Sequence, residues 1–168
     1  GAVIVNDIMG LKAKDPMIKV LKHFRDVPIA VMHIKGKPRT MQKNPVYADL
    51  MGEILESLQH SIYAGTQAGI SAERFIVDPG IGFGKTAEHN LEIIRRLGEL
   101  KSLGRPILIG TSRKSFIGKI LHLQENQRIF GTAASVACAI ANGANMVRVH
   151  DVKEIKQVVK LVDSLLHN

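Results

Sequence analysis

A glycine-rich run with a carboxylate at one end and an amine at the other is the segment best suited to bind a ligand. Residues 78–85 read Asp-Pro-Gly-Ile-Gly-Phe-Gly-Lys and follow the strand-like residues 74–77. Glycines at alternate positions permit positive φ and let backbone amides approach a ligand with no Cβ in the way. Asp78 stands at the carboxyl end of the strand, where parallel α/β folds bind their ligands. The run therefore predicts a binding loop with one carboxylate facing the ligand.

Polar residues also follow the other four predicted strands. They are Asn6 and Asp7, then His33 with residues 35–42, then residues 110–115 (Gly-Thr-Ser-Arg-Lys-Ser), and finally residues 148–151 (Arg-Val-His-Asp). Several have an equally simple structural interpretation, since Asn, Asp and Ser are the usual helix N-caps and a single histidine after an apolar strand is often structural. The alternatives stay open for each residue alone, but their recurrence at every strand end predicts a common site.

The residue types at these strand ends suit a phosphorylated nitrogen heterocycle. Asp78 and Asn6 could recognise adjacent ring N–H and amino groups, because a carboxylate accepts two such bonds and an amide both donates and accepts. Lys114 supplies a point charge, and Arg148 and His150, two residues apart on one strand, project to the same face and could grip a phosphate or diphosphate. Residues 112–115 open a predicted helix, whose free amides favour an anion.

Five strand-helix units position these residues. Strands are predicted over residues 2–5, 29–32, 75–77, 107–109 and 146–149, and helices over 16–24, 46–68, 87–100, 115–121, 126–142 and 152–166. This alternation predicts an α/β fold with five parallel βα units joined by crossovers, in a sheet or a barrel. Five units are too few to close an eight-stranded barrel, so we expect the carboxyl-terminal portion of a longer protein that lacks about three units. A small open sheet complete in itself is the alternative.

Composition narrows the function classes. With 45% hydrophobic and 23% charged residues, the 168-residue chain can bury the core of one domain, residues 1–168. The apolar runs are too short to span a bilayer and no signal peptide opens the chain, which predicts a cytoplasmic protein without a membrane partner. The net charge of +8 is dispersed and aromatic residues are few, which argues against nucleic acid. Cys138, the only cysteine, is predicted to be a buried apolar residue, and no His or Cys spacing predicts a metal site.

Six segments carry the motifs of one known family in the same order. They are residues 5–8 (Val-Asn-Asp-Ile), 32–42 (Met-His-Ile-Lys-Gly-Lys-Pro, then Met-Gln at 41–42), 78–85, 110–118, 131–133 (Gly-Thr-Ala) and 148–152 (Arg-Val-His-Asp-Val). Through them the chain resembles, over all 168 residues, the dihydropteroate synthase family, a transferase of folate biosynthesis and the sulfonamide target. The resemblance implies a TIM-type (β/α)8 barrel that condenses 6-hydroxymethyl-7,8-dihydropterin diphosphate with p-aminobenzoate, releasing pyrophosphate with the help of Mg²⁺.

The resemblance also implies a role for individual residues. It assigns the pterin pocket to Asn6, Ile8, Met32, Asp78, Phe83, Gly110, Lys114 and Arg148. Within that pocket Asp78 and Asn6 hold the amino and ring nitrogens, Lys114 holds the ring oxygen and N5 side, and Arg148 stacks over the ring. Arg148 and His150 bind the diphosphate, while Ser112 and Arg113, with Lys114, border the p-aminobenzoate site. Asp78, Lys114, Arg148 and His150 are the predicted catalytic set, and no metal ligand is assigned.

The chain departs from the family pattern by lacking three further βα units, with two active-site loops, a pterin-binding aspartate and an asparagine implicated with the metal. A non-catalytic pterin-binding fragment is therefore the alternative. A methyltetrahydrofolate-dependent methyltransferase is a second one, against which the segments 112–115 and 148–150 argue because methyl transfer needs no diphosphate or arylamine site. For the full-length protein the resemblance implies a homodimer.

Overall fold

The computed structural model describes residues 1–11 and 16–166 and confirms the predicted α/β class. Its strands run parallel and in chain order. One sheet has the order β1-β2-β3, a second pairs β4 with β5, and a bridge between Val77 and Ile107 links the two. The strand bounds are β1 Val5–Asp7, β2 Ile29–Met32, β3 Phe75–Asp78, β4 Leu108–Ile109 and β5 Met146–Val147. This is the arrangement of five βα units of a partial (β/α)8 barrel.

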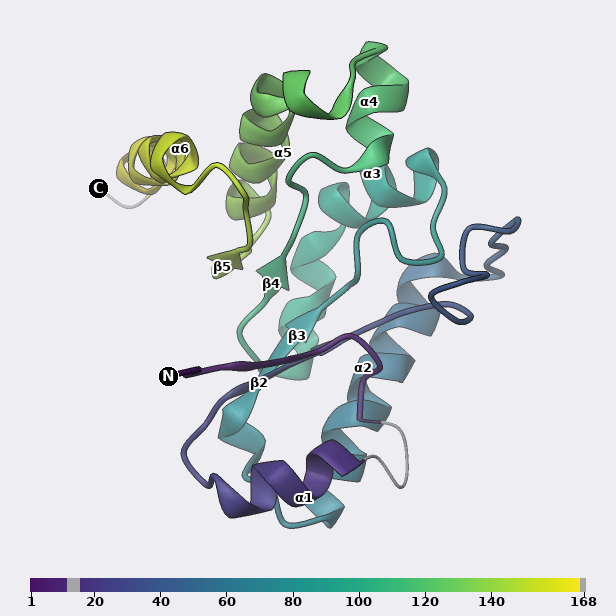
Figure 1. The fold of residues 1–168 in the computed structure, drawn as a ribbon, viewed down its shortest axis with the longest axis vertical. Coiled ribbons are helices and arrows are strands. Elements are labelled where there is room, and N and C mark those ends of the chain that lie inside the picture. The colour runs from purple at the N-terminus through teal and green to yellow at the C-terminus, as the bar shows by residue number, and fades with distance from the viewer. Residues whose placement is uncertain (12–15, 167–168) are drawn as a thin grey trace.

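Helices follow the strands and lie on one side of them. Figure 1 shows them in an arc, from α1 at the bottom past α2 and α3 to α4, α5 and α6 at the top and upper left. Their bounds are α1 Pro16–His23, α2 Leu50–Gln67, α3 Ala87–Arg95, α4 Ser115–Leu121, α5 Ile129–Ala141 and α6 Val152–Leu166, with 3-10 turns at η1 Ala72–Arg74, η2 Leu97–Leu103 and η3 Glu125–Gln127. Among the described residues, none of the helices is long and apolar enough to cross a bilayer.

The strands have two distinct faces, one packed against the helices and the other facing the inside of the partial barrel. Odd-numbered residues of the strands, such as Ile29, Phe75 and Val77, pack with Met51 and Ile54 of α2 in the main core. Even-numbered residues face the other way and form a small cluster of Ala30, Ile76 and Leu108, with Met146 against it. Because successive strand residues point to opposite faces, the even positions define the inner face of the partial barrel.

Several boundaries differ from the sequence prediction. The first strand begins at Val5 rather than at residue 2, because its pairing with β2 begins at Val5 and Ile29, so Asn6 and Asp7 lie within the strand. Helix α2 begins at Leu50 rather than at residue 46, because Asp49 caps it by accepting a hydrogen bond of 3.1 Å from the Gly52 N–H. The predicted helix over residues 87–100 ends at Arg95 and continues as the 3-10 turn η2.

The prediction that Cys138 is buried is wrong. Helix α5 turns Thr132, Val136 and Ala139 toward the core, and these residues are fully buried. Cys138 is two positions from Val136, about 200° around the helix at the 100° per residue of an α-helix, and it is exposed. The residues around Cys138 are apolar because α5 is rich in alanine, but only one side of the helix is buried.

Candidate functional site

Asp78 is a buried carboxylate at the carboxyl end of β3. Its side chain is 5% exposed, and its Oδ1 accepts a hydrogen bond of 2.7 Å from the Gly80 N–H. Burial raises the pKa of Asp78 to about 6, while the Gly80 hydrogen bond and the positive charges of Lys85, Arg148 and Lys114 act in the opposite direction. A carboxylate this deep, surrounded by cations, has the properties predicted for the residue that recognises the ligand.

The glycine-rich loop after Asp78 has the positive φ angles that the sequence predicts. Gly80, Gly82 and Gly84 have φ of +72°, +80° and +68°. A Cβ added at Gly80 would lie 2.0 Å from the carbonyl oxygen of His33, and one at Gly84 would lie 2.4 Å from that of Lys35. The loop therefore lies against the backbone that follows β2, so both conformation and space require glycine at these two positions.

Side chains from the neighbouring segments brace this loop. The Gly82 N–H donates to Oδ1 of Asn90 in α3 at 2.8 Å, and the Gly82 carbonyl accepts from Nε2 of Gln42 at 2.5 Å. The hydroxyl of Tyr47 donates to the Gly84 carbonyl at 2.7 Å. Hydrogen bonds with the segment between β2 and α2 and with α3 thus hold the loop in place.

Five of the predicted site residues share the inner face of the strands. The register pairs Asn6 with Ala30 and Met32 with Asp78, and all four have the parity of the inner-face cluster. Gly110 and Arg148 lie just beyond the ends of β4 and β5, and they too are even-numbered. The five residues are Asn6, Met32, Asp78, Gly110 and Arg148. Asn6 is exposed, whereas Met32 and Asp78 are buried.

Lys114 and Phe83 form a contact at the edge of the glycine loop. Nζ of Lys114, which directly precedes α4, lies 4.4 Å from the centroid of the Phe83 ring. Burial, and then the neighbouring charge of Arg148, lowers the pKa of Lys114, while Asp78 raises it. A Cβ added at Gly110 would lie 3.6 Å from Nη2 of Arg148, which places that guanidinium over the end of β4.

A cavity of about 330 Å³ lies next to Lys114. Seven of the residues that line it were predicted from the sequence, namely Gly110, Ser112, Arg113, Lys114, Ser115, Arg148 and His150. Glu125 and Arg128 also line it and were not predicted. Ser112 is buried and fixes His150, because its Oγ accepts from the His150 N–H at 3.2 Å and contacts Nδ1 of the same ring at 3.0 Å. The cavity is strongly cationic.

Arg113 is held by the chain itself. Its Nε and Nη2 donate to the two carboxylate oxygens of Asp151, the first at 3.0 Å, and its backbone N–H donates to Oγ1 of Thr132 at 3.1 Å. Arg128 donates from Nη1 to the Arg113 carbonyl at 2.8 Å. The ion pair raises the pKa of Arg113 and lowers that of Asp151. No individual role was assigned from the sequence to Asp151, Thr132 or Arg128, although Asp151 was among the polar residues after the fifth predicted strand and Thr132 belongs to the 131–133 motif.

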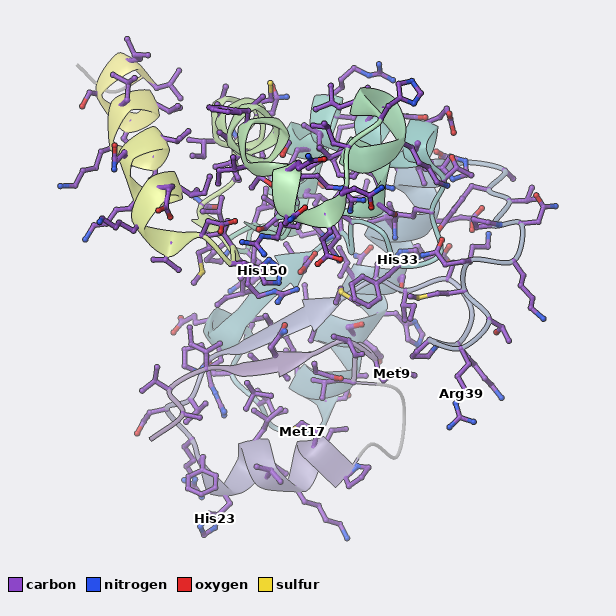
Figure 2. All side chains as sticks on the ribbon, turned by 45° about the horizontal axis from the view of Figure 1, so that its top comes forward. Met9, Met17, His23, His33, Arg39 and His150 are labelled. Carbon is purple, nitrogen blue, oxygen red and sulfur yellow. The ribbon has the colours of Figure 1, made fainter. Side chains whose placement is uncertain are left out.

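The remaining predicted residues lie around the loops after β1 and β2. Ile8 is half-buried directly after β1, and Asp7 accepts from the N–H groups of Met9 and Leu11 at 2.9 and 2.7 Å, so it organises its own loop. Figure 2 shows His33 beyond β2, His150 beyond β5, and Arg39 at the outer end of the loop after β2, pointing away from both histidines.

A metal site built by the protein is not found in the described part of the chain. Within residues 1–11 and 16–166, no group of three or more His, Cys, Asp or Glu side chains is arranged to hold a metal ion. Of the carboxylates near the cavity, Asp151 pairs with Arg113 and Asp78 accepts from Gly80, whereas Glu125 lines the cavity and acts on Arg113 through its charge. These residues do not fit a magnesium site made of protein ligands alone.

Comparison with known proteins points to one enzyme family. The family described as "Pterin binding enzyme" matches residues 1–150. A dihydropteroate synthase from Synechocystis is 46% identical over 166 residues, which are 98% of this chain and 57% of that protein. The chain therefore spans less than two thirds of the length of this relative.

Solved structures agree with the sequence match. Dihydropteroate synthase from Yersinia pestis, in complex with a sulfonamide drug, is 37% identical and superposes with a TM-score of 0.94, over 98% of this chain and 59% of that one. The enzyme from Xanthomonas albilineans, in complex with 7,8-dihydropteroate, is 32% identical with a TM-score of 0.89, over 100% of this chain and 61% of that one.

Proposed function

The chain belongs to the pterin binding enzyme family, and from this premise we propose that it serves the dihydropteroate synthase reaction. The substrates would be 6-hydroxymethyl-7,8-dihydropterin diphosphate and p-aminobenzoate, and the products 7,8-dihydropteroate and pyrophosphate. One observation carries the proposal. The buried carboxylate of Asp78 and a cationic cavity lined by Lys114, Arg148 and His150 lie at the same ends of the strands. A heterocycle with a diphosphate on its side chain has the complementary pair of groups.

We propose that residues 1–168 form a single pterin-binding domain within a longer barrel. The chain spans 57% of the length of the Synechocystis relative and 61% of the Xanthomonas albilineans chain, which supports this proposal. It also has five βα units, whereas a closed (β/α)8 barrel has eight.

Recognition of the pterin would begin at Asp78. A carboxylate can accept hydrogen bonds from a ring N–H and the adjacent amino group, and Asp78 is ionised above about pH 6. Asn6 and Met32 share its face and would contact the ring edge and plane. Lys114, over the Phe83 ring, would donate to the ring oxygen and N5 side, and Ile8 and Gly110 would complete the walls.

Binding of the diphosphate would fall to Arg148 and His150. A guanidinium can donate two parallel hydrogen bonds to phosphate oxygens, and Arg148 reaches over Gly110 toward the cavity. The contact of Nδ1 with Ser112 orients the imidazole of His150 and leaves Nε2 as the nitrogen for a phosphate oxygen. Ser112, Arg113 and Lys114 line the same cavity, which supports their proposed place beside p-aminobenzoate.

The proposed reaction needs no nucleophilic side chain. The bond between the pterin methylene and the diphosphate oxygen breaks with its electron pair on the diphosphate, and the arylamine nitrogen then bonds to the methylene and loses a proton to water. Arg148, His150 and Lys114 would stabilise the charge on the leaving group, while Asp78 would stabilise positive charge on the pterin. Mg²⁺ commonly binds through one or two carboxylates together with substrate phosphates. Its binding to the diphosphate stays a prediction, and none of the steps above requires it.

An assay of pyrophosphate release tests the proposal. With both substrates present, the wild-type chain is expected to release pyrophosphate, and the Asp78→Asn variant is expected to lose this activity. Release without p-aminobenzoate, or equal release by Asp78→Asn, would contradict it. Pterin binding without any release would instead favour the non-catalytic pterin-binding fragment, an alternative that the short span of the chain relative to its relatives supports.

A further inference from the structure

Lys85, the last residue of the glycine-rich loop, is a buried cation with no role in the account above. Its side chain is 3% exposed, and its Nζ lies 2.9 Å from Nδ1 of His33 and 3.2 Å from the carbonyl oxygen of Phe83, to which it donates. His33 is itself only 5% exposed. Since lysine is almost never buried without a partner, the position of Lys85 calls for an explanation beyond loop packing.

The polar and charged groups that act on Lys85 or on Asp78 come from four of the five strand ends. His33 follows β2, Asp78 ends β3, Lys114 precedes α4 and Arg148 follows β5. Asp78 attracts the Lys85 ammonium, Lys114 repels it, and both lysines and Arg148 favour the ionised form of Asp78. The rings of Tyr47 and His33 pack with their centroids 6.1 Å apart. Nζ of Lys35 lies over the Tyr47 ring and also pairs with Glu53.

Both buried groups titrate close to neutral pH. Burial lowers the pKa of Lys85 to about 7, an effect that Asp78 partly offsets, and burial raises the pKa of Asp78 to about 6. Below about pH 7 the lysine is therefore a cation whose charge acts on Asp78, in the pH range where that carboxyl group would otherwise take up a proton. Among the cations that act on Asp78, Lys85 has the largest effect.

Resting on the proposed function, we propose that Lys85 is a positioning residue that donates to Nδ1 of His33, thereby fixing the Nε2-protonated tautomer, and that its ammonium keeps Asp78 ionised for pterin recognition. The Phe83 carbonyl is the second acceptor that fixes the amine. The side chain thus contacts the His33 ring after β2 and the glycine loop, and its charge acts on the carboxylate of Asp78.

Nuclear magnetic resonance of the ligand-free 168-residue chain tests both parts. The first measurement follows the Asp78 side-chain carboxyl ¹³C signal, assigned by its loss in Asp78→Asn, from pH 4 to pH 9. We expect Lys85→Met to move the Asp78 titration upward by about one pH unit or more, as removal of an adjacent opposite charge does. Lys160→Met, which removes an exposed lysine on α6, is the matched control and should leave it unchanged. Equal titrations in wild type and Lys85→Met would overturn the electrostatic role.

The second measurement needs no variant, so it tests the proposed hydrogen bond from Lys85 to His33 even if Lys85→Met does not fold. The ¹⁵N shifts of His33 in the wild-type chain are expected to show Nδ1 as an unprotonated acceptor and Nε2 as the protonated nitrogen. A proton on Nδ1 would overturn the assigned donor. Neither measurement uses a pterin, so failure of the proposed function would appear in the pyrophosphate assay, whereas failure of this inference would appear in these spectra.

Discussion

Replacement of Asp78 by asparagine is expected to stabilise the chain while removing the carboxylate that we propose binds the pterin. The pKa of Asp78 is raised from its ordinary value of 3.8 to about 6 in the folded chain. A difference of about two pH units corresponds to roughly 3 kcal/mol of folding free energy that the ionised carboxylate costs at high pH. Asparagine carries no charge, and its side-chain oxygen can still accept the hydrogen bond from the Gly80 N–H. We therefore expect a gain of about 1–3 kcal/mol at pH 8.

The pH dependence has a definite sign. Because the folded state holds the Asp78 proton more tightly than the unfolded state, this group stabilises the wild type fully below about pH 4 and loses that contribution as the pH rises through about 6. The advantage of Asp78→Asn should thus be absent near pH 4 and complete by pH 8. At pH 8 the neighbouring Lys85, with a pKa of about 7, is mostly neutral, so the substitution leaves no unpaired buried ammonium.

Urea unfolding of the wild type, Asp78→Asn and Asp26→Asn at pH 4 and pH 8 measures this difference. Asp26 is exposed, so its replacement removes the same charge and should change the stability by no more than about 0.5 kcal/mol. An Asp78→Asn chain that is no more stable than wild type at pH 8, or equally stabilised at both pH values, would refute the reasoning.

Three further predictions follow from the site. Pterin affinity should fall by about tenfold per pH unit below about pH 6, as Asp78 takes up a proton, and a titration series that is flat between pH 5 and 7 would contradict this. Arg148→Ala should weaken binding of the pterin diphosphate by tenfold or more relative to the unphosphorylated pterin, measured by calorimetry, whereas equal losses would assign Arg148 to the ring alone. Gly80→Ala should cost more than about 3 kcal/mol in urea unfolding, because its Cβ would meet the His33 carbonyl, whereas Gly69→Ala, also at positive φ but in open space, should cost only about 1–2 kcal/mol.

Three elements have the bounds that the sequence predicted, because their own residues determine where they begin and end. The strand over residues 29–32 and the helices over residues 115–121 and 152–166 have the predicted bounds, because a wholly apolar run and a strong helical period leave little choice. The start of β1 depends instead on where β2 offers partners, and the apolar residues 2–4 have none. Pairing between strands that lie more than twenty residues apart cannot be seen in a single segment.

The same distinction holds for the site. The positive φ angles of the glycine loop and the polar strand ends were predicted, since glycine spacing and strand parity are local properties. The contact of Lys85 with His33 spans 52 positions and the pair of Arg113 with Asp151 spans 38, so both arise only when the loops after different strands meet. The exposure of Cys138 was missed because composition cannot tell which side of α5 faces the core.

Calorimetric titration of 6-hydroxymethyl-7,8-dihydropterin diphosphate into the 168-residue chain, with the unphosphorylated pterin for comparison, tests the central claim most directly. The account predicts that the chain binds both ligands through Asp78 and binds the diphosphate more tightly, because Arg148 and His150 line the adjacent cationic cavity. A folded chain that binds neither ligand, or that binds both with equal affinity, would contradict the assignment of these strand ends to a pterin diphosphate.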